Sequence, residues 1–221
     1  MKRVLEPEYM DNEKEALDYD AMDHEQVNGA FVERMIELGL TGRILDLGCG
    51  PGHIPPMIID RISDVQEVVG LDAASSMLIL AEKRRASATR PEAIAYVLGD
   101  AKGLPFEDNA FDGIVSNTVL HHIPDPVPFL KEACRVLKDA GGLLIRDLFR
   151  PDHPDQVQHL VHLHAREAND EQKALFHASL CAALTPAELR QAARDAGIRN
   201  FEVVIDSDRH MSLQKRPGRD S

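Results

Sequence analysis

Short apolar runs and amphipathic stretches alternate over the first 150 residues of the chain. The apolar runs are short, which is typical of buried strands. Strands that alternate with helices predict right-handed crossovers and a parallel sheet covered by helices on both faces. We expect strands at residues 43–47, 67–71, 94–98, 113–116 and 143–147. Apolar residues recur at helical spacing at residues 23–38, 54–61, 75–88 and 127–137.

The pattern changes after residue 150. Residues 155–183 hold two amphipathic helical patterns rich in His, Leu and Ala, with no strand between them, and we expect a helical cap. A further helix is predicted from Thr185, a favourable N-cap, to about residue 196. Two β-rich segments, 201–205 and 210–214, predict an antiparallel C-terminal hairpin.

Together these elements predict an α/β fold. We expect a Rossmann-like, doubly wound, mostly parallel seven-stranded sheet with the C-terminal hairpin and the helical insertion attached. A chain of 221 residues suits one domain, and we assign residues 26–221 to it. Residues 1–25 hold nine Asp and Glu against three Lys and Arg, which predicts a solvated N-terminal arm or lid.

The composition narrows the class of protein. Hydrophobic residues make up 43% and charged residues 28%, and no apolar stretch has the length of a membrane span. The first residues lack the apolar core of a signal peptide, so we expect a cytoplasmic location. Cys49, Cys134 and Cys181 are too widely spaced to predict a disulfide framework or a zinc site. The net charge of −12 argues against a nucleic-acid partner, because phosphate binding relies on Lys and Arg clusters.

The first strand leads into an unusual loop, in which an apolar run ends as Asp-x-Gly-x-Gly-x-Gly at Ile44–Gly52. Glycine adopts positive φ and lets a ligand lie against bare backbone, and the next helix offers unpaired N–H groups. A dinucleotide fingerprint would need glycine at position 53, where this chain has His53. An NAD-dependent oxidoreductase is therefore the less favoured interpretation. Cys49 is expected to fill space in the loop.

Three aspartates follow successive predicted strands, at Asp46, Asp72 and Asp100. In an open parallel sheet, ligands bind outside the carboxyl ends of the strands, so these side chains are expected to meet there. A carboxylate accepts hydrogen bonds from a vicinal diol or an amine. Such an acidic rim suits a cofactor with an ammonium, a sulfonium, a ribose and an adenine better than a pyrophosphate. The alternative for each aspartate is that it caps the next helix or turn.

Residues 42–150 resemble the ubiquinone/menaquinone-biosynthesis-type (UbiE-like) branch of the class I S-adenosylmethionine (SAM)-dependent methyltransferases. The order and spacing of several sequence blocks carry this resemblance. These blocks are Ile44–Gly52, Gly70–Leu78, Gly99–Phe106, Phe111–Asn117, Leu120–Ile123 and Arg135–Gly142.

The resemblance implies SAM as the cofactor and S-adenosylhomocysteine (SAH) as the product. By resemblance, Asp46 and the glycine loop would surround the methionine part, and Asp72 would take the ribose. Met77 and Ala101 would flank the adenine, and Asp100 would accept from its amine. The expected cofactor-binding residues are Asp46, Gly48, Cys49, Gly50, Gly52, Asp72, Ala73, Met77, Asp100, Ala101 and Asn117.

Methyl transfer from a sulfonium is an in-line displacement, so a base is needed only if the acceptor carries a proton at attack. His121 and His122 follow the fourth strand and are the candidate catalytic residues. Either one deprotonates or orients the acceptor, or it packs under the next loop, and we expect at least one to pack. Arg146 and Arg150 lie on the same rim, where each pairs with an acidic substrate group or with a neighbouring aspartate.

Two further groups of side chains have two interpretations each. Tyr19, Met22 and His24 precede the first helix and would form a lid over the cofactor, or would be residues of a surface arm. A second group consists of histidines 153, 159, 162, 164 and 177. Their spacing matches no metal-ligand pattern and no Cys lies nearby, so we expect no metal there.

The sequence thus predicts a SAM-dependent methyltransferase that acts on a small molecule. The alternative from another class is a catalytically inactive protein that binds SAM or SAH as a partner or sensor. Quinone precursors, other aromatic compounds and aliphatic acids are all open as acceptors.

Overall fold

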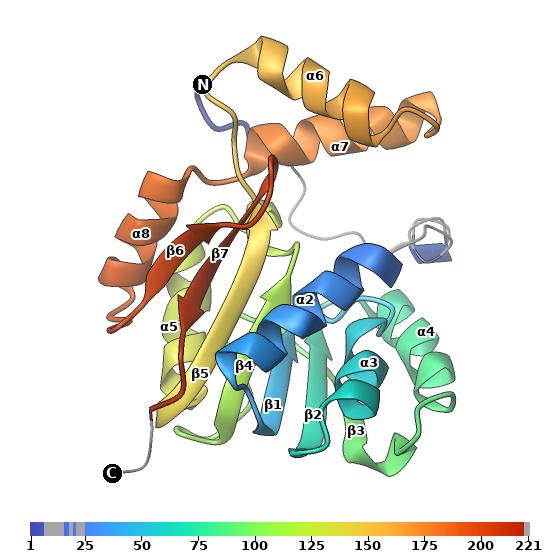
Figure 1. The fold of residues 1–221 in the computed structure, drawn as a ribbon, viewed down its shortest axis with the longest axis vertical. Coiled ribbons are helices and arrows are strands. Elements are labelled where there is room, and N and C mark those ends of the chain that lie inside the picture. The colour runs from blue at the N-terminus through green and yellow to red at the C-terminus, as the bar shows by residue number, and fades with distance from the viewer. Residues whose placement is uncertain (7–15, 18–19, 21–24, 219–221) are drawn as a thin grey trace.

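The structure is a computed structural model, which describes residues 1–6, 16–17, 20 and 25–218. Its centre is a seven-stranded sheet in the order β3-β2-β1-β4-β5-β7-β6 (Figure 1). Strands β1 to β5 pair in parallel, and β7 pairs antiparallel with both β5 and β6, which confirms the predicted fold class. The strands are β1 Gly42–Leu47, β2 Val65–Asp72, β3 Ile94–Leu98, β4 Phe111–Asn117, β5 Leu137–Leu148, β6 Glu202–Ile205 and β7 His210–Lys215.

Helices cover both faces of this sheet. Apolar residues of α2 and α3 pack on one face, and those of α5 and α8 pack on the other. The α-helices are α2 Glu25–Leu38, α3 Ile54–Arg61, α4 Ser75–Arg85, α5 Pro126–Val136, α6 Pro154–His164, α7 Asp170–Ala182 and α8 Pro186–Asp195. Two short 3₁₀ turns are η1 Pro91–Ala93 and η2 Leu120–His122.

Successive side chains of β1 point to opposite faces of the sheet. Ile44 packs with Phe31 and Ile58 on the α2 and α3 side, whereas Leu45 packs with Phe129 on the other side. All five are fully buried, and the burial of each side chain contributes roughly 1.5–3 kcal/mol. The strand is therefore apolar on both faces, which is why it reads as a continuous apolar run.

One boundary prediction was wrong. A strand was expected at residues 143–147, but β5 already begins at Leu137. Gly142 lies in the strand opposite Gly113 of β4. A Cβ at Gly141 would lie 2.9 Å from the main-chain oxygen of Asp112, so glycine permits a close approach of two strands here.

The expected helical cap is present as α6 and α7. Figure 1 shows both helices lying across the end of the sheet at which β4 and β5 finish. Val157 and Leu160 of α6 pack with Leu180 of α7 and with Leu148, the last residue of β5. This small separate core fixes the cap above the carboxyl ends of the strands.

The first six residues, which belong to the expected N-terminal arm, contact the end of α7. The main-chain N–H of Val4 donates to the carbonyl of Cys181 at 3.1 Å. The Arg3 guanidinium donates to the carbonyl of Ala182 at 2.6 Å, at the C-terminal end of α7. Carbonyls at a helix C-terminus lack intrahelical partners and attract cations, so this end of α7 holds residues 1–6 in place.

Arg150 also has a structural role. Its side chain is almost fully buried and donates to the carbonyl of Ala183 at 2.7 Å and to the carboxylate of Glu188 at 2.7 Å. A third bond reaches the carbonyl of Met1 at 3.1 Å. The expected partner was an acidic substrate group or a neighbouring aspartate. Instead, these bonds join the residue that lies two positions after β5 to the chain's first residue, to the end of α7 and to α8.

We expect Arg150→Ala to lower the free energy of unfolding by at least about 2 kcal/mol, because the buried carbonyl of Ala183 and two part-buried acceptors lose their donor. Urea unfolding followed by circular dichroism measures this difference. The matched control is Arg199→Ala, at an exposed arginine, which should change stability by less than about 0.5 kcal/mol. Equal stability of the two variants would contradict the structural role of Arg150.

Candidate functional site

The topology opens a crevice beside β1. The chain runs from β1 outward to β2 and β3 and then returns to β4 on the other side of β1, so the loops after β1 and β4 leave in opposite directions. A cavity of about 410 Å³ lies at this point, lined by the loops that follow β1, β2, β3 and β4. Nine of the expected cofactor-binding residues line it: Gly48, Cys49, Gly50, Asp72, Ala73, Met77, Asp100, Ala101 and Asn117.

The glycine loop has the backbone that its sequence predicts. Gly48, Gly50 and Gly52 have φ angles of +72°, +53° and +74°, a region that other residues rarely adopt. A Cβ at Gly48 would lie 2.5 Å from the side chain of Val119, and one at Gly52 would lie 2.5 Å from the hydroxyl of Tyr96. Nothing lies within 4 Å of a Cβ at Gly50, which faces the open cavity. Gly52 itself packs beneath the loop and does not line the cavity.

Asp72 ties two loops together. One carboxylate oxygen accepts from the N–H of Gly50 at 2.8 Å, and the other accepts from the N–H of Ala74 at 2.9 Å. The bond to Ala74 is the turn-capping alternative, and the bond to Gly50 fixes the glycine loop against the end of β2. Each carboxylate oxygen has a second lone pair, so the side chain can still accept from a ligand.

Asp100 at the end of β3 has a more open environment. Its carboxylate accepts from the main-chain N–H of Lys102 at 2.8 Å and forms an ion pair with the Lys102 ammonium at 3.1 Å. The side chain is 58% exposed, so water and ligands have access to it. Asp100 thus caps its own turn while it lines the cavity.

Asp46 differs from the other two aspartates. It is 1% exposed and lies beneath the glycine loop, outside the residues that line the cavity. Neither carboxylate oxygen has a hydrogen-bond partner among the described residues. Burial, followed by the charge of Asp72, raises its pKa to about 7. Because an unpaired buried carboxylate is costly, a cationic group bound in the loop above would stabilise its charged form.

The structure adds lining residues that the sequence did not single out. Asn28 of α2 lines the cavity, and its side-chain oxygen accepts from the amide of Asn117 at 3.3 Å. Asn28 is 7% exposed on the buried side of a helix that also carries Phe31 and Val32. In the sequence, a polar residue on an otherwise apolar helical face was the signal that could have indicated Asn28 as a site residue. His53 also lines the cavity, at the position where a dinucleotide site would have glycine.

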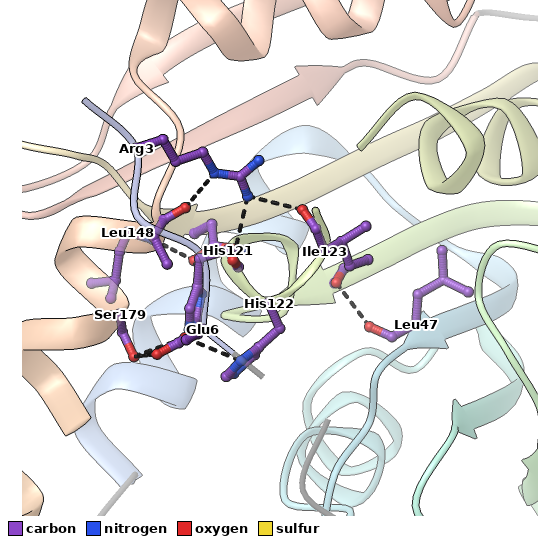
Figure 2. Close-up of polar contacts among 11 residues, drawn as sticks. Arg3, Glu6, Leu47, His121, His122, Ile123, Leu148 and Ser179 are labelled. Carbon is purple, nitrogen blue, oxygen red and sulfur yellow. Dashed lines mark hydrogen bonds and ion pairs between the residues drawn. The ribbon is translucent and has the colours of Figure 1, made fainter. Parts of the chain in front are cut away.

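The two candidate histidines have different positions. His121 is buried, with Nδ1 at 2.7 Å from a carboxylate oxygen of Asp147 and Nε2 at 3.3 Å from Glu6 (Figure 2). Burial lowers the pKa of His121, but the carboxylates of Asp147 and Glu6 outweigh it and the net shift is upward. His122 lines the cavity, with Nδ1 at 3.1 Å from Glu6. Therefore His121 is the histidine that packs, and His122 faces the ligand space.

Other predicted site residues lie elsewhere. Arg146 does not line the cavity; its guanidinium donates to the carbonyl of Val27 at 3.3 Å, on the side of α2, and burial lowers its pKa. Tyr19, Met22 and His24 lie outside the described residues, so their expected role as a lid stays a prediction.

The cavity, the glycine loop and the acidic rim define a ligand site of the nucleotide-binding type on a Rossmann-like sheet. Residues 45–145 match the family model described as "Methyltransferase domain", which spans slightly less than half of the chain. This segment is therefore similar to methyltransferase domains, and the resemblance seen in the sequence blocks is confirmed.

Curated relatives agree with this family. An uncharacterized methyltransferase of Bacillus subtilis is 34% identical over 145 residues, which cover 62% of this chain and 56% of that protein. The demethylmenaquinone methyltransferase of Shouchella clausii is 33% identical over 110 residues, which cover 50% of this chain and 46% of that protein. The chain thus spans about half the length of the curated relatives it matches.

Solved structures share the fold over most of the chain. A SAM-dependent methyltransferase from Aquifex aeolicus has a TM-score of 0.68 at 19% identity, covering 92% of this chain and 97% of its own. A Haemonchus contortus phosphoethanolamine N-methyltransferase, in complex with phosphomonomethylethanolamine and SAH, has a TM-score of 0.62 at 22% identity. That match covers 80% of this chain and 38% of the neighbour. In the part of the chain that the structure describes, none of the helices combines the length and apolarity needed to cross a membrane.

The position of Asp46 leads to a pH prediction. Its pKa is raised from 3.8 to about 7 in the folded protein, so the unfolded chain releases this proton first as the pH rises. Folding stability should therefore fall by about 1.4 kcal/mol per pH unit between roughly pH 4 and 7 on account of this group. Asp46→Asn removes this loss, so the variant should gain on the wild type as the pH rises.

Urea unfolding of both proteins at pH 4.5, 6 and 8 measures the effect. Asp64→Asn, at an exposed aspartate before β2, is the matched control and should differ from the wild type by a constant amount. If the stability curves of the wild type and Asp46→Asn run parallel, then Asp46 is not the isolated buried carboxylate described above.

Proposed function

We propose that this protein transfers the methyl group of SAM to a small-molecule acceptor. The observation that carries the proposal is the unpaired, buried carboxylate of Asp46 beneath a glycine loop that opens onto a cavity of about 410 Å³. A cavity of this size is typical of small-ligand sites. The similarity of residues 45–145 to methyltransferase domains supports the same function.

The residues around the cavity fit SAM by their chemistry. Asp46 would stabilise the cationic methionine part above it, and Asp72 would accept from the ribose hydroxyls with its remaining lone pairs. Met77 and Ala101 would flank the adenine, and Asp100 would accept from its amine. When bound, SAM supplies an electrophilic methyl group on a sulfonium. The chain's own contribution is to orient the two reactants and to exclude water.

The opposite wall of the cavity is where we place the acceptor. Asn117, Val119 and His122 come from the end of β4 and the turn after it, and Asn28 comes from α2. This wall combines apolar and polar side chains but has no arginine or lysine among its described residues. His122 would orient the acceptor or take its proton, because an imidazole whose Nδ1 faces Glu6 has a second ring nitrogen available. Helix α7 of the cap at residues 155–183 contacts the η2 turn that carries His122, so we propose that this cap helps to select the acceptor.

Calorimetry with SAM and SAH tests the cofactor assignment. We expect the wild type to bind both, and Asp72→Ala to weaken binding by about 100-fold or more, because the variant loses a ligand contact and the bond that fixes Gly50. Asp64→Ala, at the other end of β2, is the matched control and should bind as the wild type does. Thermal unfolding of each variant checks that the fold is retained.

No heat from the wild type at millimolar SAM would refute the proposal. Binding of SAM without any methylated product from a mixture of small-molecule acceptors would instead favour the inactive partner or sensor. Mass spectrometry of acceptors incubated with isotopically labelled SAM distinguishes these two outcomes.

A further inference from the structure

Three potential metal-ligating side chains from distant parts of the chain converge next to the cavity. Glu6 comes from the N-terminal segment, and His121 and His122 come from the turn after β4. One ligand atom from each residue lies within 4.8 Å of the other two. Among the described residues, this is the group of His, Cys, Asp and Glu that brings three such atoms together. The histidines at 153, 159, 162, 164 and 177 do not belong to it.

The distances between these atoms suit a small divalent ion. The Glu6 Oε1 atom is 3.3 Å from His121 Nε2 and 3.1 Å from His122 Nδ1. Zn²⁺ binds imidazole nitrogen at about 2.0–2.1 Å and carboxylate oxygen at about 2.0–2.2 Å, so two ligands of a tetrahedral ion lie about 3.4 Å apart. Two imidazoles and one carboxylate form a set that first-row transition metals prefer over Mg²⁺ or Ca²⁺.

Neighbouring groups already orient two of the three side chains. The Asp147 carboxylate accepts a hydrogen bond from His121 Nδ1 at 2.7 Å, which directs Nε2 toward Glu6. The Ser179 hydroxyl donates to Glu6 at 3.3 Å, and Figure 2 shows Glu6 between Ser179 and His122. Metal-binding histidines almost always donate their other ring nitrogen to a carboxylate or carbonyl in this way.

The charge of the cluster also leaves room for a cation. Glu6 and Asp147 are two carboxylates with side-chain exposures of 10% and 3%. The nearby Arg3 guanidinium supplies one positive charge, but its donors bind main-chain carbonyls, including those of Ala182 and Ile123. The group is therefore one positive charge short unless a proton on an imidazole or a metal ion supplies it.

We propose that Glu6, His121 and His122 bind one divalent transition-metal ion of the Zn²⁺ type. His122 lines the cavity, so the ion would reach its site from there and would keep a coordination position open toward the ligand space. This position would take an oxygen donor, such as a hydroxyl or carboxylate, of the methyl acceptor. The inference about the acceptor rests on the proposed function, whereas the metal site does not depend on it.

Titration of the chelator-treated full chain with Co²⁺ tests the site. We expect one equivalent of Co²⁺ with the visible absorption of a four- or five-coordinate ion, displaced by Zn²⁺ in a calorimetric competition. Glu6→Gln and His122→Ala each remove one ligand and should weaken binding by at least 100-fold. Asp147→Asn should weaken it by about 10- to 100-fold, because it removes the orienting partner of His121.

His159→Ala is the matched control, because His159 is an exposed histidine on α6 that lies outside the cluster. Its titration should equal that of the wild type. Should a ligand variant fail to fold, X-ray absorption of the wild type with Zn²⁺ replaces it, and two imidazoles with oxygen ligands are expected. Binding that survives the double variant Glu6→Gln/His122→Ala, or the absence of binding to the wild type at 0.1 mM (about 5 kcal/mol of affinity), would overturn the proposal.

SAM calorimetry on the metal-free protein separates this inference from the proposed function. SAM binding without metal binding would leave the proposed function standing and refute the metal site. Metal binding without SAM binding would do the reverse.

Discussion

The hydrogen bonds of Asp72 are the constraint on which the site depends. Its carboxylate joins the glycine loop after β1 to the turn after β2 through Gly50 and Ala74. Because both loops leave the carboxyl end of the sheet, this link fixes the crevice that the β1–β4 reversal opens. The positive φ angles of the loop would be costly in most sequences, and glycine at alternate positions makes them accessible. The cavity is therefore largely formed before any ligand binds, which lowers the ordering cost of binding.

A second set of contacts joins the N-terminal segment to the cap and to the turn after β4. The N-terminal segment lies against the end of α7 through Val4 and Arg3, and Glu6 reaches the histidines that follow β4. These contacts connect residues that are more than a hundred positions apart, so the cap, the first residues and the β4 turn form one unit. A ligand that changes the environment of His122 would therefore also affect the N-terminal segment through Glu6. This gives the N-terminal residues a direct physical connection to the site.

The alternation of strands and helices was predicted well from the sequence. Strand and helix order, the cap and the glycine loop follow from local periodicity and glycine spacing, and the structure has them close to the expected bounds. The N-terminal contacts did not follow, because Glu6 and Arg3 are ordinary charged residues whose partners are set by the tertiary fold. The Gly141-Gly142 pair shows the same limit: glycine marks either a turn or a close approach of two strands, and only the pairing of β4 with β5 decides between them. Arg150 carries no local signal at all that its partners are carbonyls rather than a substrate.

Two buried aspartates, Asp46 and Asp147, differ in the hydrogen-bond donors that the fold supplies to them. Burial raises the pKa of both Asp46 and Asp147, but Asp147 has His121 and two main-chain N–H donors around it, so its pKa is lowered overall. Asp46 has no such donors among the described residues, and its pKa stays raised. The fold therefore supplies hydrogen-bond donors to the Asp147 carboxylate near the end of β5. Among the described residues, it supplies none to the Asp46 carboxylate in β1. A buried acceptor without a donor lowers stability in the free protein. A cation bound in the glycine loop above Asp46 would offset this cost.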